Sequence, residues 1–105
     1  MYHSRIVGLG HYVPENIVTN DDLSKLMDTD DAWITERTGI KERRLIEKNS
    51  DEGTASMGVK AAEMALERAG VSKDDIDLVI FATLSPDLYF PGSGVLLQDL
   101  MGILN

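Results

Sequence analysis

Three residues in the first half of the sequence have side chains suited to holding a ligand. Trp33 and Arg37 are four residues apart in a segment that we expect to be helical, so they share one face. A tryptophan ring offers a flat stacking surface, and an arginine offers a planar fork for phosphate. Thr29, just before that helix, can donate or accept a hydrogen bond. The set would suit a ligand with a purine and nearby phosphates. The alternative is a core tryptophan beside a surface arginine.

The basic residues are concentrated next to this candidate site. The chain carries a net charge of −8, from 18 acidic and 10 basic residues, which argues against general nucleic-acid binding. Half of the basic residues nevertheless lie close together: Arg37, Lys41, Arg43, Arg44 and Lys48. The cluster indicates one anionic ligand or partner. The alternative is a solvated turn whose charges pair with neighbouring glutamates.

The other polar residues point to no catalytic or metal site. There is no cysteine, so the segment has no disulfide, thiolate zinc site or cysteine nucleophile. His3 and His11 have no second ligand at metal-binding spacing, and we interpret both as surface or strand-end residues. The carboxylates are scattered over turns and expected helix starts rather than paired for catalysis. The residues alone therefore predict no catalytic residue and no metal.

The candidate ligand residues need a helix, and the sequence predicts one over Asp31–Thr38. The polar stretch Asp28-Thr29-Asp30 is suited to cap its start and Gly39 to end it. Asn20 predicts the N-cap of a preceding short helix over Asp21–Met27. Residues 40–46 fit either a short strand or a loop.

The second half of the chain has the clearest helix, over Thr54–Ala69, ended by Gly70. Its inward positions are rich in alanine and glycine, which lets a neighbouring segment approach closely. A helical turn is expected at residues 72–75, a proline- and glycine-containing loop over 84–94 and a helix over 95–104.

Two strands are expected, over residues 5–13 and 78–82. The second is uninterrupted and apolar, as in parallel sheets covered on both faces. Gly8 and Gly10 do not form a dinucleotide-binding motif, because the third glycine is missing and Pro14 stands where a helix should begin. We interpret them as sites of close backbone approach. Strands and helices that alternate indicate an α/β fold with no internal domain boundary over residues 1–105.

We expect neither membrane insertion nor secretion. No apolar run approaches the ~20 residues that a membrane-spanning helix requires. The first residues lack the long apolar stretch of a signal peptide. The sequence thus predicts a cytoplasmic protein that contacts no membrane.

Several stretches, in order along the chain, resemble the N-terminal region of β-ketoacyl-acyl carrier protein synthase III. They are Ile6–Pro14, Thr19–Asn20, Asp28–Ile34, Arg37–Arg43, Ala82–Thr83 and Phe90–Pro91. The stretch from Asp28 to Arg43 is the most specific. The resemblance implies a thiolase-like α/β fold made of two similar halves, of which this chain would be most of the first.

The resemblance also implies an activity. Members of this family condense an acyl-coenzyme A, usually acetyl-CoA, with malonyl-acyl carrier protein, which starts fatty acid synthesis. The family works as a homodimer, needs no cofactor and uses CoA thioester as substrate. Its catalytic cysteine, histidine and asparagine match no residue here, so we expect the isolated segment to be inactive. The alternatives are a standalone CoA- or carrier-binding module and a piece of another thiolase-fold condensing enzyme.

Four residues match positions of known role in the family. Trp33 resembles the tryptophan that stacks on the CoA adenine, and Arg37 resembles an arginine near the CoA phosphates. Thr29 resembles a polar neighbour of the adenine. Phe90 resembles an aromatic residue that crosses the dimer interface and limits the partner's acyl pocket. The sequence around Phe90 departs from the best-known members, which leaves the acyl chain length open.

Overall fold

The computed structural model describes residues 1–104, which divide into two compact units. One unit is Val13–Ser50, and the other combines Met1–Tyr12 with residues 51–104. The expected absence of an internal domain boundary stays a prediction, because local compactness does not by itself define an independently folding domain.

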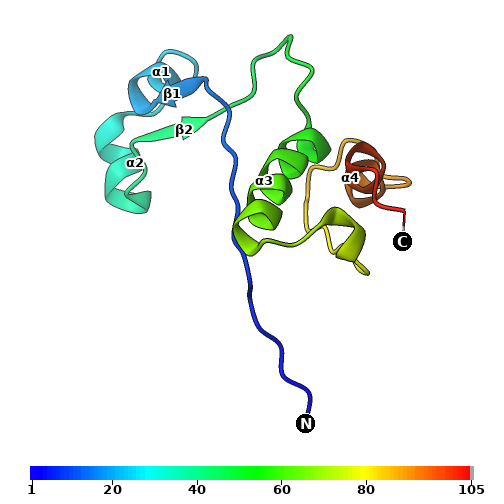
Figure 1. The fold of residues 1–105 in the computed structure, drawn as a ribbon. Helices are drawn as coiled ribbons and strands as arrows, with labels where there is room; N and C mark the ends of the chain where they lie inside the picture. Colours follow the sequence, from blue (N-terminus) through cyan, green and yellow to red (C-terminus); the bar gives the residue numbers. More distant parts are fainter. Residues whose placement is uncertain (105) are drawn as a thin grey trace. The chain divides into compact units, whose positions relative to one another are not determined.

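The unit Val13–Ser50 contains a two-stranded antiparallel sheet and two short helices (Figure 1). Strand β1 (Ile17–Thr19) leads directly into helix α1 (Asn20–Ser24), and helix α2 (Asp31–Thr38) is followed by strand β2 (Glu42–Arg44). Val18 of β1 lies opposite Arg43 of β2. Residues 40–46, which fitted either a strand or a loop, therefore include a strand.

Helix α1 begins one residue earlier than expected and is shorter. Its N-cap is Thr19, whose hydroxyl accepts a hydrogen bond from the Asp22 amide while the Asp22 carboxylate accepts from the Thr19 amide. The prediction of Asn20 as N-cap is thus wrong, because Asn20 is buried instead. The helix ends at Ser24 rather than Met27. Leu26 and Met27 are exposed, so no apolar contact stabilises a further turn.

Helix α2 has the bounds predicted from the sequence. The Asp30 carboxylate accepts a hydrogen bond from the Trp33 amide at 2.7 Å, which caps the N-terminus. Gly39 ends the helix with a φ of 71°, a conformation that glycine adopts without steric cost. Ile34 is the buried residue of this helix.

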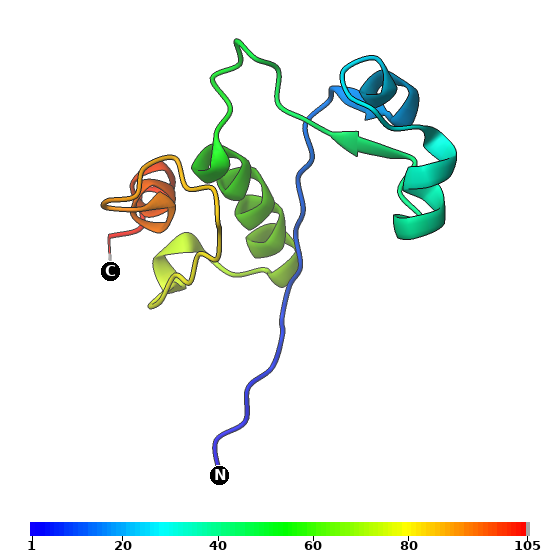
Figure 2. The ribbon, with the colours of Figure 1, turned by 180° about the vertical axis from the view of Figure 1, so that it is seen from behind.

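The second unit is built on helix α3 (Thr54–Ala69), which also has the predicted bounds. A 3₁₀ turn η1 (Lys73–Asp75) and helix α4 (Ser93–Met101) complete its regular elements (Figure 2). Its buried apolar residues are Ala55, Leu97 and Ile103. The helix expected over 95–104 starts two residues earlier and ends at Met101, followed by the C-cap Gly102, which has a φ of 64°.

The N-terminal residues run alongside helix α3 as an extended segment. The predicted close approach is confirmed, since a Cβ at Gly8 or Gly10 would overlap the backbone of Ala65 or Ala61. Arg68 Nη1 donates a hydrogen bond to the Leu9 carbonyl at 3.1 Å. The alanine-rich surface of α3 and the two glycines therefore form one tight contact.

Neither of the two predicted strands is a strand in residues 1–104. Residues 5–13 and 78–82 are extended, but neither pairs with another strand in this part of the chain. Leu78 is 75 % exposed and Ile80 is 85 % exposed, so the second segment is not covered on both faces. A strand needs a neighbour for its backbone groups, and composition cannot say which segment supplies one.

Candidate functional site

Trp33 and Arg37 lie together on helix α2, as their spacing predicted. The Arg37 guanidinium lies 4.4 Å from the centre of the Trp33 ring. Arg37 Nη1 also lies 3.4 Å from the Trp33 carbonyl oxygen and 3.7 Å from a Glu36 carboxylate oxygen. Trp33 is 53 % exposed. The structure therefore contradicts a core tryptophan and presents an accessible ring beside a cation.

Thr29 lies just before helix α2, and its hydroxyl group, unlike the Trp33 ring, is not accessible. Its hydroxyl oxygen is buried and has no hydrogen-bond partner within residues 1–104. A buried hydroxyl without a partner is costly and uncommon in folded proteins. A ligand contact through this hydroxyl would therefore require the segment before α2 to move.

The buried Asn20 side chain joins helix α2 to the rest of its unit. Its Nδ2 group lies 2.8 Å from Asp31 Oδ1 and 2.8 Å from the Ile40 carbonyl oxygen. Its Oδ1 atom accepts a hydrogen bond from Arg43 Nη2 at 2.6 Å. Asn20 is 1 % exposed. Sequence reasoning missed this role, because an asparagine just before a helical pattern most often indicates a cap.

Two members of the basic cluster have structural roles. Arg43 Nη1 donates to the Val18 carbonyl at 3.2 Å, and Arg44 Nη1 donates to the Pro14 carbonyl at 3.0 Å. Within residues 1–104, Lys41 and Lys48 form no ion pair closer than 4 Å. Arg37, Lys41 and Lys48 therefore remain as candidate cations for an anionic ligand. The alternative, charges paired with neighbouring glutamates, holds within residues 1–104 only for Arg37 with Glu36.

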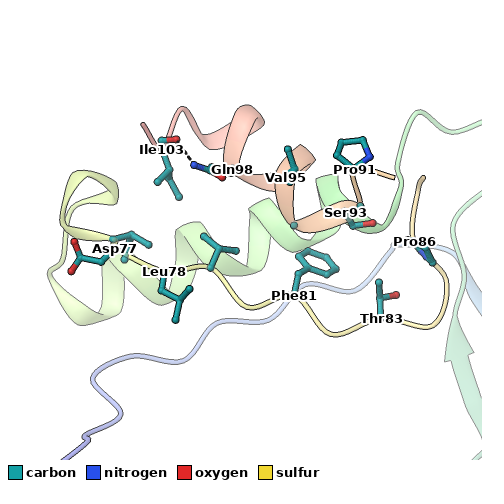
Figure 3. A pocket seen from close by; sticks show the side chains of 14 residues that line it. Asp77, Leu78, Phe81, Thr83, Pro86, Pro91, Ser93, Val95, Gln98 and Ile103 are labelled. Carbon is teal, nitrogen blue, oxygen red and sulfur yellow. Dashed lines mark hydrogen bonds between the residues drawn. The ribbon is translucent and has the colours of Figure 1, made fainter. Parts of the chain in front are cut away.

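Phe90 belongs to the other compact unit and is 89 % exposed. It lies in the loop before α4, next to a cis Phe90–Pro91 peptide bond. This loop, the extended residues 76–83 and helix α4 border a cavity of about 470 Å³ (Figure 3). Phe81 and Gln98 are among its lining residues, and Gln98 Nε2 donates to the Ile103 carbonyl at 3.2 Å. The sequence indicated the loop but gave no sign of the cavity.

A charged cluster fastens the N-terminal segment to helix α3. Lys60 Nζ donates to Glu52 Oε1 at 2.5 Å and to the Tyr12 hydroxyl at 3.0 Å, and it lies 4.1 Å from the centre of the Tyr12 ring. The Tyr12 hydroxyl donates to the same Glu52 oxygen. The hydrogen bond between Lys60 and Glu52 lowers the pKa of the Glu52 carboxyl group and raises the pKa of the Lys60 ammonium group.

Two further properties bear on function. None of the helices in residues 1–104 is both long and apolar enough to cross a membrane. No three metal-ligating side chains of the same residues gather closely enough to hold an ion.

The chain is similar in sequence to proteins of known activity. No model of a known protein family matches the chain. Over 102 residues the chain is 46 % identical to the β-ketoacyl-[acyl-carrier-protein] synthase III of Clostridium novyi, and the alignment covers 97 % of this chain and 31 % of that protein. The chain thus spans about a third of the length of the curated relatives it matches.

Solved structures agree with this similarity. The 3-oxoacyl-[acyl-carrier-protein] synthase III of Aquifex aeolicus matches with a TM-score of 0.86 at 45 % identity, covering 93 % of this chain and 31 % of that one. The priming β-ketosynthase of the R1128 polyketide pathway matches with a TM-score of 0.86 at 37 % identity, covering 94 % and 29 %. The family resemblance and the thiolase-like fold class predicted from the sequence are both confirmed.

Proposed function

We propose, from the similarity of this chain to β-ketoacyl-acyl carrier protein synthase III, that it is the N-terminal part of an acyltransferase of this kind. The whole enzyme would condense an acyl-CoA, usually acetyl-CoA, with malonyl-acyl carrier protein and so start fatty acid synthesis. The observation that carries the proposal is the exposed Trp33 ring with the Arg37 guanidinium 4.4 Å from its centre. It lies in a chain 46 % identical to such a synthase.

The geometry of α2 supports a contact with the nucleotide end of CoA. The guanidinium covers one face of the Trp33 ring, so the adenine would stack on the opposite face. Arg37 can keep its place over the ring while its remaining N–H groups meet a phosphate. Thr29 would contribute its hydroxyl after a shift of the segment before the helix. CoA would be a substrate here, and no cofactor is proposed.

The segment itself would perform no chemistry. An acyl-enzyme intermediate needs a nucleophile such as a cysteine thiolate, and the 105 residues contain no cysteine. The catalytic cysteine, histidine and asparagine would thus come from outside these residues. We expect no condensing turnover by the isolated chain.

Partners and location belong to the same proposal. The exposed Phe90 side chain suits a contact across a homodimer interface, where an aromatic residue gains from burial. The acyl carrier protein would be the second partner. We place the enzyme in the cytoplasm and propose no contact with a membrane or nucleic acid.

One alternative has an observation in its favour. The priming β-ketosynthase of a polyketide pathway is 37 % identical to this chain and has the same TM-score as the Aquifex aeolicus enzyme. The chain could thus belong to a condensing enzyme that primes a different product. Both possibilities predict the same CoA contacts and differ in acyl specificity.

The CoA contact can be tested directly, because Trp33 is the single tryptophan of the chain. We expect CoA and adenosine 3′,5′-bisphosphate to quench its fluorescence with weak affinity, roughly millimolar, and pantetheine to leave it unchanged. Arg37→Ala should weaken the titration about tenfold through loss of a phosphate contact. Lys25→Ala is the control, because Lys25 is an exposed cation of the same unit that lies outside the basic cluster.

Two outcomes would count against the proposal. Equal quenching by pantetheine and CoA would mean that the ring does not contact the adenine. An unchanged titration in Arg37→Ala would remove the phosphate contact. Tight binding by the isolated chain would instead favour the standalone binding module, because the site of a larger enzyme should be incomplete here.

A further inference from the structure

One carboxylate, that of Asp87, joins three separate stretches of the second unit. Its Oδ2 atom accepts a hydrogen bond from the Ala55 amide at 2.8 Å and another from the Ser93 hydroxyl at 2.7 Å. The Asp87 amide donates in return to Ser93 Oγ at 3.0 Å. Ala55 lies in the first turn of α3, and the buried Ser93 is the first residue of α4. Asp87 thus ties its loop to the start of both helices.

Helix α3 has no N-cap side chain of its own. Its N-cap residue is Gly53, whereas N-caps usually carry a short polar side chain that accepts from an amide of the first turn. A Cβ at Gly53 would overlap the Asp87 carboxylate. The Thr54 hydroxyl adds a second tie to the same loop by donating to the Ser85 carbonyl at 2.7 Å. The glycine therefore leaves room for a cap that the distant loop supplies.

We propose that Asp87 is the positioning residue of the loop 84–92, and that it fixes the place of Phe90 by capping α3 and holding Ser93. Pro86, Pro91 and Ser93 line the cavity beside this loop, so the same contacts shape its rim (Figure 3). The hydrogen bond from Ser93 is the main cause of a lowered pKa for Asp87, which favours the ionised, accepting form. The role of Phe90 rests on the proposed function, whereas the contacts of Asp87 do not.

The phenylalanines of the chain allow a direct test. There are two, Phe81 and Phe90, so labelling with fluorinated phenylalanine gives one fluorine NMR signal from the loop and one reference signal. In Asp87→Ala we expect the Phe90 signal to move or broaden more than the Phe81 signal, because Phe81 lines the cavity but lies outside the loop 84–92. Amide exchange at Ala55 should rise roughly fivefold, the effect of losing a helix cap.

A double variant separates positioning from simple capping. Gly53→Ser combined with Asp87→Ala returns a local N-cap to α3, for which the extended backbone of Gly53 is suited. We expect Ala55 exchange to return to its original rate while the Phe90 signal remains displaced. A Phe90 signal that is restored in the double variant, or unchanged in Asp87→Ala, would overturn the proposal.

Two further points keep the test decisive. If Asp87→Ala does not fold, Asp87→Asn keeps the size of the side chain and takes its place, with smaller changes expected in the same direction. An unchanged Phe90 signal in Asp87→Asn would then overturn the proposal. The Trp33 titration with CoA reports on the other compact unit. A failed CoA site would thus leave the fluorine signals and the Ala55 exchange rate as they are.

Discussion

The two compact units differ in whether their extended segments pair within the unit. In Val13–Ser50, the strands pair with each other, and the buried Asn20 amide has hydrogen-bond partners on α2, on β2 and between these elements. In the other unit, the extended residues 76–83 pair with no strand among residues 1–104, and Leu78 and Ile80 are largely exposed. The proposed ligand site lies wholly in the first unit, whereas the second unit exposes apolar side chains on an unpaired segment.

The contrast has a consequence for function. Trp33 and Arg37 project from a helix whose cap and buried contacts lie in its own unit. Phe90 projects from a loop held by Asp87, next to an exposed apolar segment. We therefore expect ligand contact at α2 to tolerate changes in the second unit, and contact through Phe90 to depend on what covers that unit.

The largest effect should come from Asn20→Ala. The substitution removes the hydrogen-bond partner of the Ile40 carbonyl and of Arg43 Nη2. We expect a loss of about 2–4 kcal/mol in the free energy of unfolding that Trp33 reports. Urea titration followed by Trp33 fluorescence measures it, with the exposed Asn49→Ala as control. Equal urea midpoints for the two variants would show that Asn20 is not the centre of this unit.

The next effect concerns the exposed segment of the second unit. We expect the 105-residue chain to self-associate through Leu78 and Ile80, since burial of each side chain contributes roughly 1.5–3 kcal/mol. Replacement of both by lysine should shift the chain towards monomer in sedimentation velocity. Leu84→Lys is the control, because Leu84 is even more exposed than Leu78 and Ile80 but lies outside the apolar run. A monodisperse wild-type monomer with a cooperative melt would contradict this expectation.

The same contrast explains what the sequence could predict. Helices α2 and α3 were predicted with their exact bounds, because Asp30, Gly39 and Gly70 act on the residues next to them. The Trp33–Arg37 contact followed from helical spacing alone. These are local effects, and short-range physical rules describe them.

Features that depend on distant residues were missed. Residues 78–82 have the composition of a buried strand, but strand formation requires a partner that composition does not identify. The burial of Asn20 depends on Arg43 and Ile40, and the cap of α3 depends on Asp87. Neither contact has a signature in the neighbouring sequence, because each forms only when remote segments meet.

The smallest effect is expected for Glu52, Lys60 and Tyr12, whose side chains form hydrogen bonds with one another within the second unit. The pKa of Glu52 is lowered mainly by the hydrogen bond from Lys60, then by that from Tyr12. A lowered pKa contributes stability above the ordinary value of 4.5, and this is lost as the pH falls through the pKa of the folded state. The raised pKa of Lys60 contributes below 10.5, and this is lost as the pH rises through its folded-state value.

Glu52→Gln should therefore make the free energy of unfolding less dependent on pH, at both acid and alkaline pH. The change should be small, because the cluster is accessible to solvent and such pairs are weakened by water and salt. Urea midpoints of the wild type and the variant from pH 3 to pH 11 measure it, with Glu63→Gln, a substitution of an exposed residue of helix α3, as control. The same pH dependence in wild type and Glu52→Gln would mean that the glycine–alanine contact and the Arg68–Leu9 hydrogen bond suffice to hold the N-terminal segment on α3.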